Sequence, residues 1–299
     1  MYRLIIVLTI ITSALSGCGT PSDQTQGRSA PVILTSTTIL ADITRNIAGD
    51  RVEVDSLLPI GIDPHSYQPT PQDAAKLSKS KLLIINGAGY EHFLESLLEN
   101  AGGERTIIEA SSGITPREDA DGEHGIDPHM WLDPSYIIRY VENIRDGLIQ
   151  FDPAGEAVYK SNAETYIQQI TELDAWIMEE VNQVPAEKRL LVTNHEALGY
   201  FAERYGFTVV GTVVESFSSD ASPSAQQMAG LIDQIKASGA PAIFLDAGDT
   251  MSLAQQIADE TGARVITELH LESLTDGSPA ATYIDMMKQN VTQIVNALK

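Results

Sequence analysis

The sequence predicts an α/β fold of two lobes, each a mostly parallel β-sheet flanked by helices, with one long, rigid backbone helix joining them. Two observations carry this prediction. Short apolar runs alternate with amphipathic stretches in both halves of the chain, and strands that alternate with helices are typical of parallel sheets. Between the halves lies a linking segment, residues 152–185, which has almost no internal glycine or proline and carries apolar residues at helical spacing.

The N-terminal lobe is expected at residues 32–151. Pro71 suits an early helical position, and Asp73 places an acid in the first turn of the same helix. The predicted strands are Val32–Leu34, Val52–Leu58, Lys81–Gly87 and Thr106–Ile108. The predicted helices are Thr38–Ala48, one that begins at Pro71, Tyr90–Leu98 and Pro134–Ile149.

The linking helix is expected from Asp152 to Val184, and the C-terminal lobe at residues 186–299. In parallel sheets, ligands lie outside the carboxyl ends of the strands, so the loops that follow the strands are the places to look for a site. The predicted strands are Leu190–Thr193, Thr208–Val214, Ala242–Leu245 and Arg264–Ile266. The predicted helices are Glu196–Tyr205, Pro223–Ser238, Ser252–Thr261 and Tyr283–Leu298.

Residues 1–17 have the layout of a secretory signal peptide, because one basic residue, Arg3, precedes the short apolar run Leu4–Leu15. That run is too short to span a bilayer as a helix. It leads into Leu-Ser-Gly-Cys, which resembles a bacterial lipobox and predicts that Cys18 carries lipid. Cys18 is the only cysteine, so no internal disulfide can form. Residues 18–31 read as the lipidated cysteine and a flexible tether, which places the protein outside the cytoplasm, anchored to the membrane.

The composition is that of an acidic globular protein. Apolar residues make up 43% of the chain and the formal net charge is −22. This charge argues against nucleic acid or an anionic membrane surface as a partner, and it suits the attraction of cations. The protein is expected to act as a monomer.

A repeated pentapeptide points to a metal site. Gly61–His65 recurs letter for letter as Gly125–His129, although the flanking residues differ. Proline fixes its own φ and restricts the residue before it, so Asp-Pro-His is a stiff turn that aims an imidazole. Two such turns on separate loops suggest two histidines that meet at one metal ion. The alternative is ordinary turn chemistry with each histidine on the surface.

Other polar residues near strand ends extend this site. His195 ends a predicted strand and is the third candidate ligand. Glu272, in another loop that follows a strand, is the best candidate for a fourth, carboxylate ligand, although a solvated surface acid would look the same. His270 could compete with Glu272, whereas His92 lies on a polar helix face. His124, in an acidic stretch, is a candidate for an accessory metal contact, with a merely polar loop as the alternative.

These motifs resemble the metal-ion substrate-binding lipoproteins of bacterial ABC importers, the zinc and manganese group. The resemblance covers nearly all of the chain after the tether and is carried by Asp63–Asp73, Asp127–Pro134, Thr193–Phe201 and Leu271–Thr275. It implies a first-loop ligand at His65, a second at His129, a third at His195 and a fourth at Glu272. It also implies a membrane permease as partner, and a rigid interdomain helix where residue 152 begins the long helical segment.

The resemblance also bears on the metal. Members that look like manganese carriers tend to have a carboxylate at the third ligand position, where this chain has His195. Three imidazoles and one carboxylate suit zinc, whereas manganese favours more oxygen. Zinc is therefore the expected ion, with manganese or mixed binding as the alternative. Zinc members often carry a long histidine-rich stretch before the second motif, which here shrinks to a few acids and His124.

Two other functions compete with metal transport. A zinc hydrolase could use three histidines and a carboxylate to hold an activated water. However, the chain has no His-Glu-x-x-His sequence, and a fourth protein ligand closes the shell that a catalytic zinc leaves open. A surface adhesin is the third hypothesis, and no sequence feature favours or excludes it. We therefore expect a carrier and not an enzyme.

Overall fold

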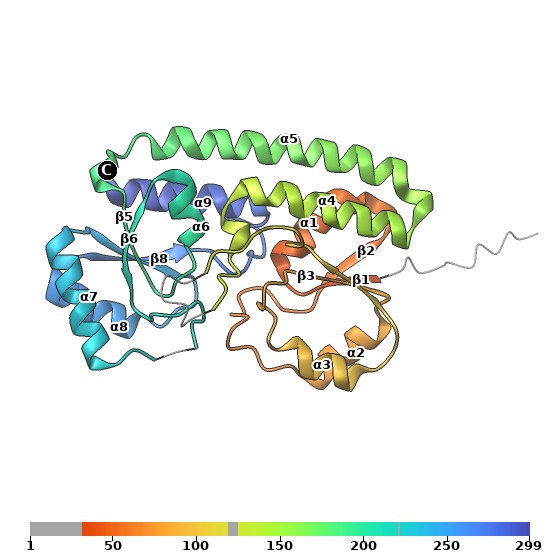
Figure 1. Ribbon diagram of the computed structural model, residues 1–299, viewed down its shortest axis with the longest axis horizontal. Helices are drawn as coiled ribbons and strands as arrows, with labels where there is room; N and C mark the ends of the chain where they lie inside the picture. The colour runs from red at the N-terminus through yellow and green to blue at the C-terminus, as the bar shows by residue number, and fades with distance from the viewer. Residues whose placement is uncertain (1–31, 119–124, 221) are drawn as a thin grey trace, which may run out of the picture.

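The computed structural model describes residues 32–118, 125–220 and 222–299. It contains two four-stranded sheets in which every pairing is parallel, with strand orders β2-β1-β3-β4 and β6-β5-β7-β8. Helices flank both sheets, and the long helix α5 runs along one side of the molecule past both of them (Figure 1). The predicted fold class is thereby confirmed. Cys18 and His124 lie outside the described residues, as do the expected signal peptide and tether.

In the N-terminal lobe, β1 is the first central strand, with β2 on one side and β3 on the other. Side chains of β3 are buried on both faces, as expected of a parallel strand that helices cover. The strands are β1 Val32–Thr35, β2 Glu53–Ser56, β3 Leu82–Ile85 and β4 Thr106–Glu109. The helices are α1 Thr38–Ala48, α2 Pro71–Lys79, α3 Leu94–Ala101 and α4 Pro134–Phe151.

The C-terminal lobe repeats the same strand order with its own four strands, and β5 and β7 are its central pair. The strands are β5 Leu190–Thr193, β6 Thr208–Thr212, β7 Ala242–Asp246 and β8 Arg264–Leu269. The helices are α6 Gly199–Tyr205, α7 Ala225–Ser238, α8 Met251–Thr261 and α9 Tyr283–Leu298. In both lobes the carboxyl ends of the strands face the junction between the lobes, which is where a ligand is expected.

The long helix α5, Glu156–Val181, spans 26 residues and packs against α4 and α1 of the first lobe and α9 of the second. It begins four residues later than predicted. Pro153 opens a short 3-10 turn, Pro153–Gly155, instead of the first α-helical turn. The Asp152 carboxylate accepts hydrogen bonds from Arg51 and Tyr159, so this corner is tied down where it precedes the helix.

Three other predicted helices also begin later than expected, among them α7, which begins at Ala225 and not at Pro223. The predicted helix Tyr90–Leu98 is wrong at its start, because α3 begins at Leu94. The residues before it form a loop in which Gly87, Ala88 and Gly89 all have positive φ, a conformation from which a helix cannot begin directly. Similarly, α6 begins at Gly199 after a turn, and not at Glu196.

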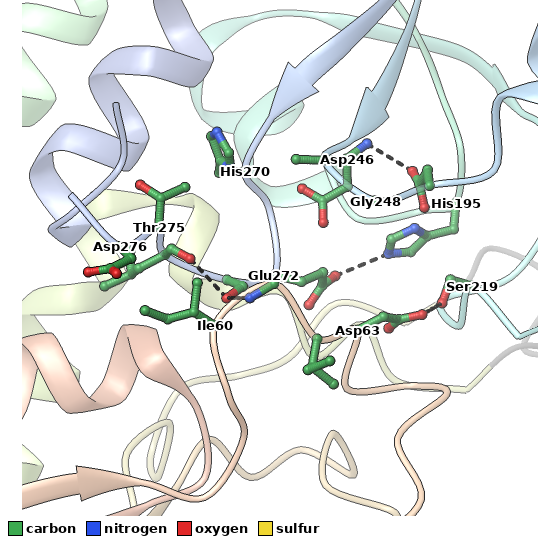
Figure 2. A pocket seen from close by; sticks show the side chains of 16 residues that line it. Ile60, Asp63, His195, Ser219, Asp246, Gly248, His270, Glu272, Thr275 and Asp276 are labelled. Atoms are coloured by element: carbon green, nitrogen blue, oxygen red, sulfur yellow. Dashed lines mark hydrogen bonds and ion pairs between the residues drawn. The ribbon is translucent and has the colours of Figure 1, made fainter. Parts of the chain in front are cut away.

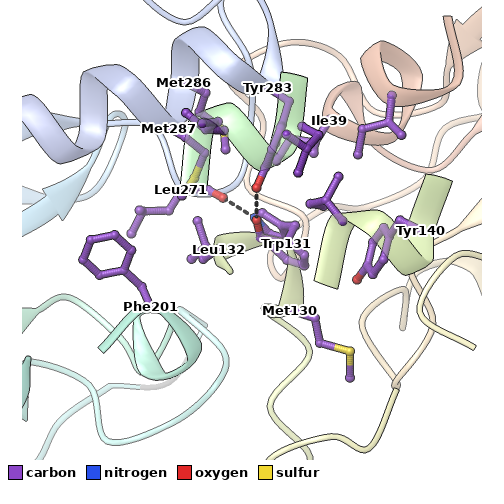
Figure 3. Close-up of a cluster of buried hydrophobic side chains, with 14 of the residues drawn as sticks. Ile39, Met130, Trp131, Leu132, Tyr140, Phe201, Leu271, Tyr283, Met286 and Met287 are labelled. Atoms are coloured by element: carbon purple, nitrogen blue, oxygen red, sulfur yellow. Dashed lines mark hydrogen bonds between the residues drawn. The ribbon is translucent and has the colours of Figure 1, made fainter. Parts of the chain in front are cut away.

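One hydrophobic cluster joins the two lobes (Figure 3). At its centre is Trp131, whose indole Nε1 donates to the backbone oxygen of Leu271 at 2.8 Å. The hydroxyl of Tyr283 in turn donates to the backbone oxygen of Trp131 at 2.7 Å. Side chains from both lobes pack around these bonds, so the core is continuous across the junction. Among the described residues, no helix is both long and apolar enough to cross a membrane.

Candidate metal centre

Four candidate ligand residues converge at the junction between the lobes. His65 comes from the loop between β2 and α2, and His129 from the loop that precedes α4. His195 follows β5, and Glu272 follows β8. One nitrogen from each histidine and one carboxylate oxygen all lie within 4.8 Å of one another. The fold therefore brings together all four residues that the sequence singled out, two from each lobe.

The centre of this group is almost completely enclosed. The exposed fractions of the side chains are 4% for His65, 0% for His129, 2% for His195 and 3% for Glu272. The Nε2 atoms of His129 and His195 each lie 3.2 Å from Glu272 Oε1, and that of His65 lies 3.8 Å from it. Figure 2 shows Glu272 and His195 pointing toward each other.

The buried Nε2 atoms of His65 and His129 lie near Glu272 Oε1, but neither makes a hydrogen bond of good geometry within the described part of the chain. A buried polar atom without a partner costs free energy, and the fold tolerates few of them. A cation at the centre would give both nitrogens a partner and would also satisfy the buried carboxylate. Three imidazole nitrogens and one carboxylate oxygen form a set that a divalent transition metal can bind.

Glu272 and His129 shift each other's pKa in opposite directions. Burial alone would raise the pKa of Glu272, but the neighbouring charge of His129 and the close contacts of the three imidazoles hold that pKa well below its usual range. Burial alone would lower the pKa of His129, but the carboxylates of Glu272 and Asp127 outweigh it and raise that pKa to about 9. A metal ion must therefore compete with a proton on His129.

The repeated pentapeptide folds the same way at both places. Asp63 Oδ1 accepts a hydrogen bond from the backbone nitrogen of His65 at 2.9 Å. Asp127 Oδ1 accepts one from the backbone nitrogen of His129 at 3.0 Å. Each aspartate thus closes the turn that presents the histidine two residues later. Because both imidazoles are enclosed, the alternative of two surface histidines is wrong.

The second copy has a further contact that the sequence did not reveal. Asp127 Oδ1 also lies 2.9 Å from Nδ1 of His129, so this carboxylate fixes the ring and leaves Nε2 to face the centre. Arg117 Nη1 contacts the other oxygen, Asp127 Oδ2, at 3.2 Å. Arg117 also reaches Glu203 of the C-terminal lobe, and its guanidinium lies over the ring of Tyr200.

Tyr90 is another contact that sequence reasoning missed. Its hydroxyl donates to Glu272 Oε2 at 2.5 Å, and the side chain is 1% exposed. The residue lies just after the glycine-rich loop at the end of β3, where the sequence predicted the beginning of a helix. That loop of mixed glycine and alanine was the only signal in the sequence that the backbone turns sharply here.

A cleft of about 280 Å³ opens beside the four residues. Asp63, Asp246, Asp249 and His270 line it together with His195 and Glu272 (Figure 2). His270 does not join the four converging residues, and its backbone is held by the side chain of Asn290. His92 is exposed, as expected. The cleft supplies an acidic approach to an otherwise enclosed centre.

Comparison with known proteins identifies the kind of molecule that carries this centre. The family described as zinc-uptake complex component A, periplasmic, matches residues 33–297. The chain belongs to this family. It is thus a metal-binding substrate-binding protein of an ABC transporter, located outside the cytoplasm, and the resemblance that the sequence motifs carried is confirmed.

Relatives align along nearly the full length of the chain. The manganese-binding lipoprotein MntA of Halalkalibacterium halodurans is 36% identical over 296 residues, which cover 98% of this chain and 97% of the relative. The iron-binding protein YfeA of Yersinia pestis is 33% identical over 297 residues, with coverages of 98% and 94%. These names differ in the metal, so the relatives support the class of cargo and not one ion.

Solved structures show the same arrangement. A manganese-bound periplasmic metal binding protein of Candidatus Liberibacter asiaticus superposes with a TM-score of 0.81 at 32% identity. The match covers 90% of this chain and 100% of that one. The periplasmic zinc binding protein TroA of Treponema pallidum gives a TM-score of 0.84 at 28% identity, with coverages of 90% and 99%. The two-lobed fold is therefore that of periplasmic metal carriers.

Proposed function

We propose that this protein captures zinc outside the cytoplasm and delivers it to the membrane permease of an ABC importer. His65, His129, His195 and Glu272 are the proposed ligands. The observation that carries the proposal is the meeting of three imidazole nitrogens and one carboxylate oxygen, all within 4.8 Å, in an enclosed centre between the lobes. Such a closed protein shell suits storage, structure or transport.

The choice of zinc rests on the chemistry of the donors. Zinc accepts nitrogen readily and is satisfied by four tetrahedral ligands, whereas manganese favours oxygen and a larger shell. At this centre nitrogen outnumbers oxygen three to one. Manganese is the second candidate, because MntA, at 36% identity, is named a manganese-binding lipoprotein. A zinc hydrolase is not favoured, since the family consists of transport proteins.

The remaining parts of the proposal concern anchoring and assembly. Cys18 is proposed to carry lipid after removal of residues 1–17, and residues 18–31 to form the tether to the membrane. We also propose a division of the chain into three parts: a lobe at residues 32–151, a linking segment at 152–185 and a lobe at 186–299. We propose that the carrier acts as a monomer and that His124 is an accessory metal contact.

Metal analysis followed by competition tests the proposal. Protein purified without added metal should contain one metal ion per chain, and zinc should outcompete manganese for the metal-free protein. His129→Ala should abolish high-affinity binding. His270→Ala is the matched control, because His270 lines the cleft but does not join the four residues. A lower Kd for manganese than for zinc would overturn the choice of ion, and full zinc affinity in His129→Ala would overturn the site.

A further inference from the structure

We propose that Tyr90 sets the metal preference of this carrier by restricting Glu272 to coordination through a single oxygen. The inference rests on the proposed ligand set. Tyr90 lies in the N-terminal lobe and Glu272 in the C-terminal lobe, so their hydrogen bond crosses the junction at the metal centre. Tyr90 is therefore a positioning residue that acts on the metal through a ligand.

The two oxygens of the Glu272 carboxylate have different surroundings. Oε1 lies 3.2 Å from the Nε2 atoms of both His129 and His195, in the middle of the group. Oε2 accepts the hydroxyl of Tyr90 at 2.5 Å. The carboxylate is thus divided between a metal-facing oxygen and an oxygen that is already occupied by a buried donor. Coordination through both oxygens would require Oε2 to leave Tyr90.

The backbone on both sides of Glu272 is also fixed. The carbonyl oxygen of Leu271 accepts from the indole of Trp131 at 2.8 Å, and the nitrogen of Leu271 donates to Asp246 Oδ1. On the other side, the backbone nitrogen of Leu274 donates to Thr38 Oγ1 at 3.0 Å, across the junction. Two-oxygen coordination therefore requires rotation of the Glu272 carboxylate. The hydrogen bond from Tyr90 to Oε2 opposes that rotation.

Tyr90 itself has little freedom to move away. Its ring packs edge to face against Trp131, with centroids 4.8 Å apart, and against His65 at 5.4 Å. The next residue, Glu91, anchors the loop, because its carboxylate accepts hydrogen bonds from the Ser36 hydroxyl and from the backbone nitrogens of Asn86 and Gly87. The hydroxyl is thus held in place before a metal arrives.

This restraint acts differently on the two candidate metals. Zinc needs one oxygen from Glu272 to complete four ligands, so the hydrogen bond to Tyr90 can persist. Manganese, which favours more oxygen ligands, gains from a second carboxylate oxygen only if that bond breaks. Breaking it would leave a buried hydroxyl without its partner, which is costly. Tyr90 therefore disfavours manganese relative to zinc.

Tyr90→Phe tests this role because it removes the hydroxyl and keeps the ring. Tyr166→Phe is the matched control, since the buried hydroxyl of Tyr166 has no hydrogen-bond partner in the described part of the chain. For each protein we would measure the ratio of the manganese and zinc Kd values by competition. X-ray absorption of the zinc-bound and manganese-bound forms would report the number of ligand atoms. The thermal midpoint of the metal-free form would check folding.

In Tyr90→Phe, manganese should gain about tenfold relative to zinc, as expected for the loss of one hydrogen bond to a charged group. The manganese form should also gain one oxygen ligand, and Tyr166→Phe should change neither quantity. An unchanged Kd ratio and an unchanged ligand number in a folded Tyr90→Phe protein would overturn the role of Tyr90. Failure of the wild-type protein to bind zinc would instead overturn the proposed function.

Discussion

Asp127 and His129 form a buried hydrogen bond, with Asp127 Oδ1 lying 2.9 Å from Nδ1 of the imidazole. Within the described residues, the first copy of the pentapeptide has no such ring contact. Asp63 accepts hydrogen bonds from the backbone nitrogen of His65 and from the hydroxyls of Ser66 and Ser219. The two copies therefore share a turn but differ in how firmly they orient the ring. This difference gives a pair of matched substitutions.

Asp127→Asn should weaken zinc binding by roughly 10- to 100-fold, the usual range for loss of a carboxylate behind a metal-bound histidine. Asp63→Asn keeps an acceptor for the backbone nitrogen of His65 and removes no contact with the imidazole ring. Its loss of zinc affinity should therefore be clearly smaller than that of Asp127→Asn. Competition titrations on both variants measure the difference. Equal losses in the two variants would show that the ring contact of Asp127 has no special effect on binding.

Gly199→Ala should disturb the same carboxylate from the C-terminal lobe. A Cβ atom at residue 199 would overlap Arg117 Nη1 and lie 2.9 Å from Asp127 Oδ2. Arg117 must move away from the buried Oδ2 atom of Asp127, and the loss of this contact should cost about 1–3 kcal/mol of unfolding free energy. Chemical denaturation of the metal-free protein measures this cost.

Gly230→Ala is the control for that substitution. Residue 230 lies in α7, and a Cβ atom added there would meet no heavy atom within 4 Å. Alanine should therefore stabilise the helix by about 0.5–1 kcal/mol. If Gly199→Ala were as harmless as this control, the contact between Arg117 and Asp127 would contribute little to stability.

Zinc binding should depend on pH through His129. In the metal-free protein the pKa of His129 is about 9, so this residue is protonated at neutral pH. Zinc must displace that proton, and the apparent affinity should rise by up to about tenfold per pH unit until pH approaches 9. Calorimetry in buffers of different ionisation enthalpy should detect proton release at pH 7. Absence of proton release would contradict the raised pKa of His129.

Glu91 should make the metal-free protein less stable as pH rises. Burial raises the pKa of Glu91 from 4.5 to about 7, although hydrogen bonds from Ser36, Asn86 and Gly87 partly oppose the shift. Between these two values the folded state holds more protons than the unfolded state, so the free energy of unfolding falls as pH increases. The total fall due to Glu91 should be at most about 3 kcal/mol.

Glu91→Gln isolates this contribution, because glutamine does not titrate. Denaturant unfolding with a chelator present, from pH 4.5 to pH 8, should give a shallower fall in the variant than in the wild type. The difference between the two curves cancels the titration of other groups. Parallel curves would show that Glu91 titrates at its ordinary value.

Local patterns predicted the fold and the converging residues well. The apolar runs that became β1, β3, β5 and β7 are short and bounded by proline or polar residues, and each is a central strand. His65, His129, His195 and Glu272 each follow a strand or a stiff turn, so their positions are visible without coordinates. Helix starts were less predictable, because loop geometry such as the positive φ values of Gly87, Ala88 and Gly89 overrides helical spacing.

Contacts across the junction could not be predicted from local patterns. Tyr90 and Glu272 are 182 residues apart, and Arg117 approaches the C-terminal lobe only because Gly199 leaves room for it. No periodicity or motif in the sequence predicts contacts between residues so far apart along the chain. The contacts around the four converging residues therefore depend on tertiary structure, whereas the four residues themselves can be predicted from the sequence.

The continuous core around Trp131 limits the motions by which this carrier can release a bound metal ion. A wide swing of one lobe would pull the indole from the carbonyl of Leu271 and expose apolar side chains from both sides to water. Metal release should therefore proceed through small displacements of the four loops that bear the proposed ligands, at little cost to the core. A permease that bound those loops would therefore meet nearly the same overall shape in the metal-free and the metal-bound carrier.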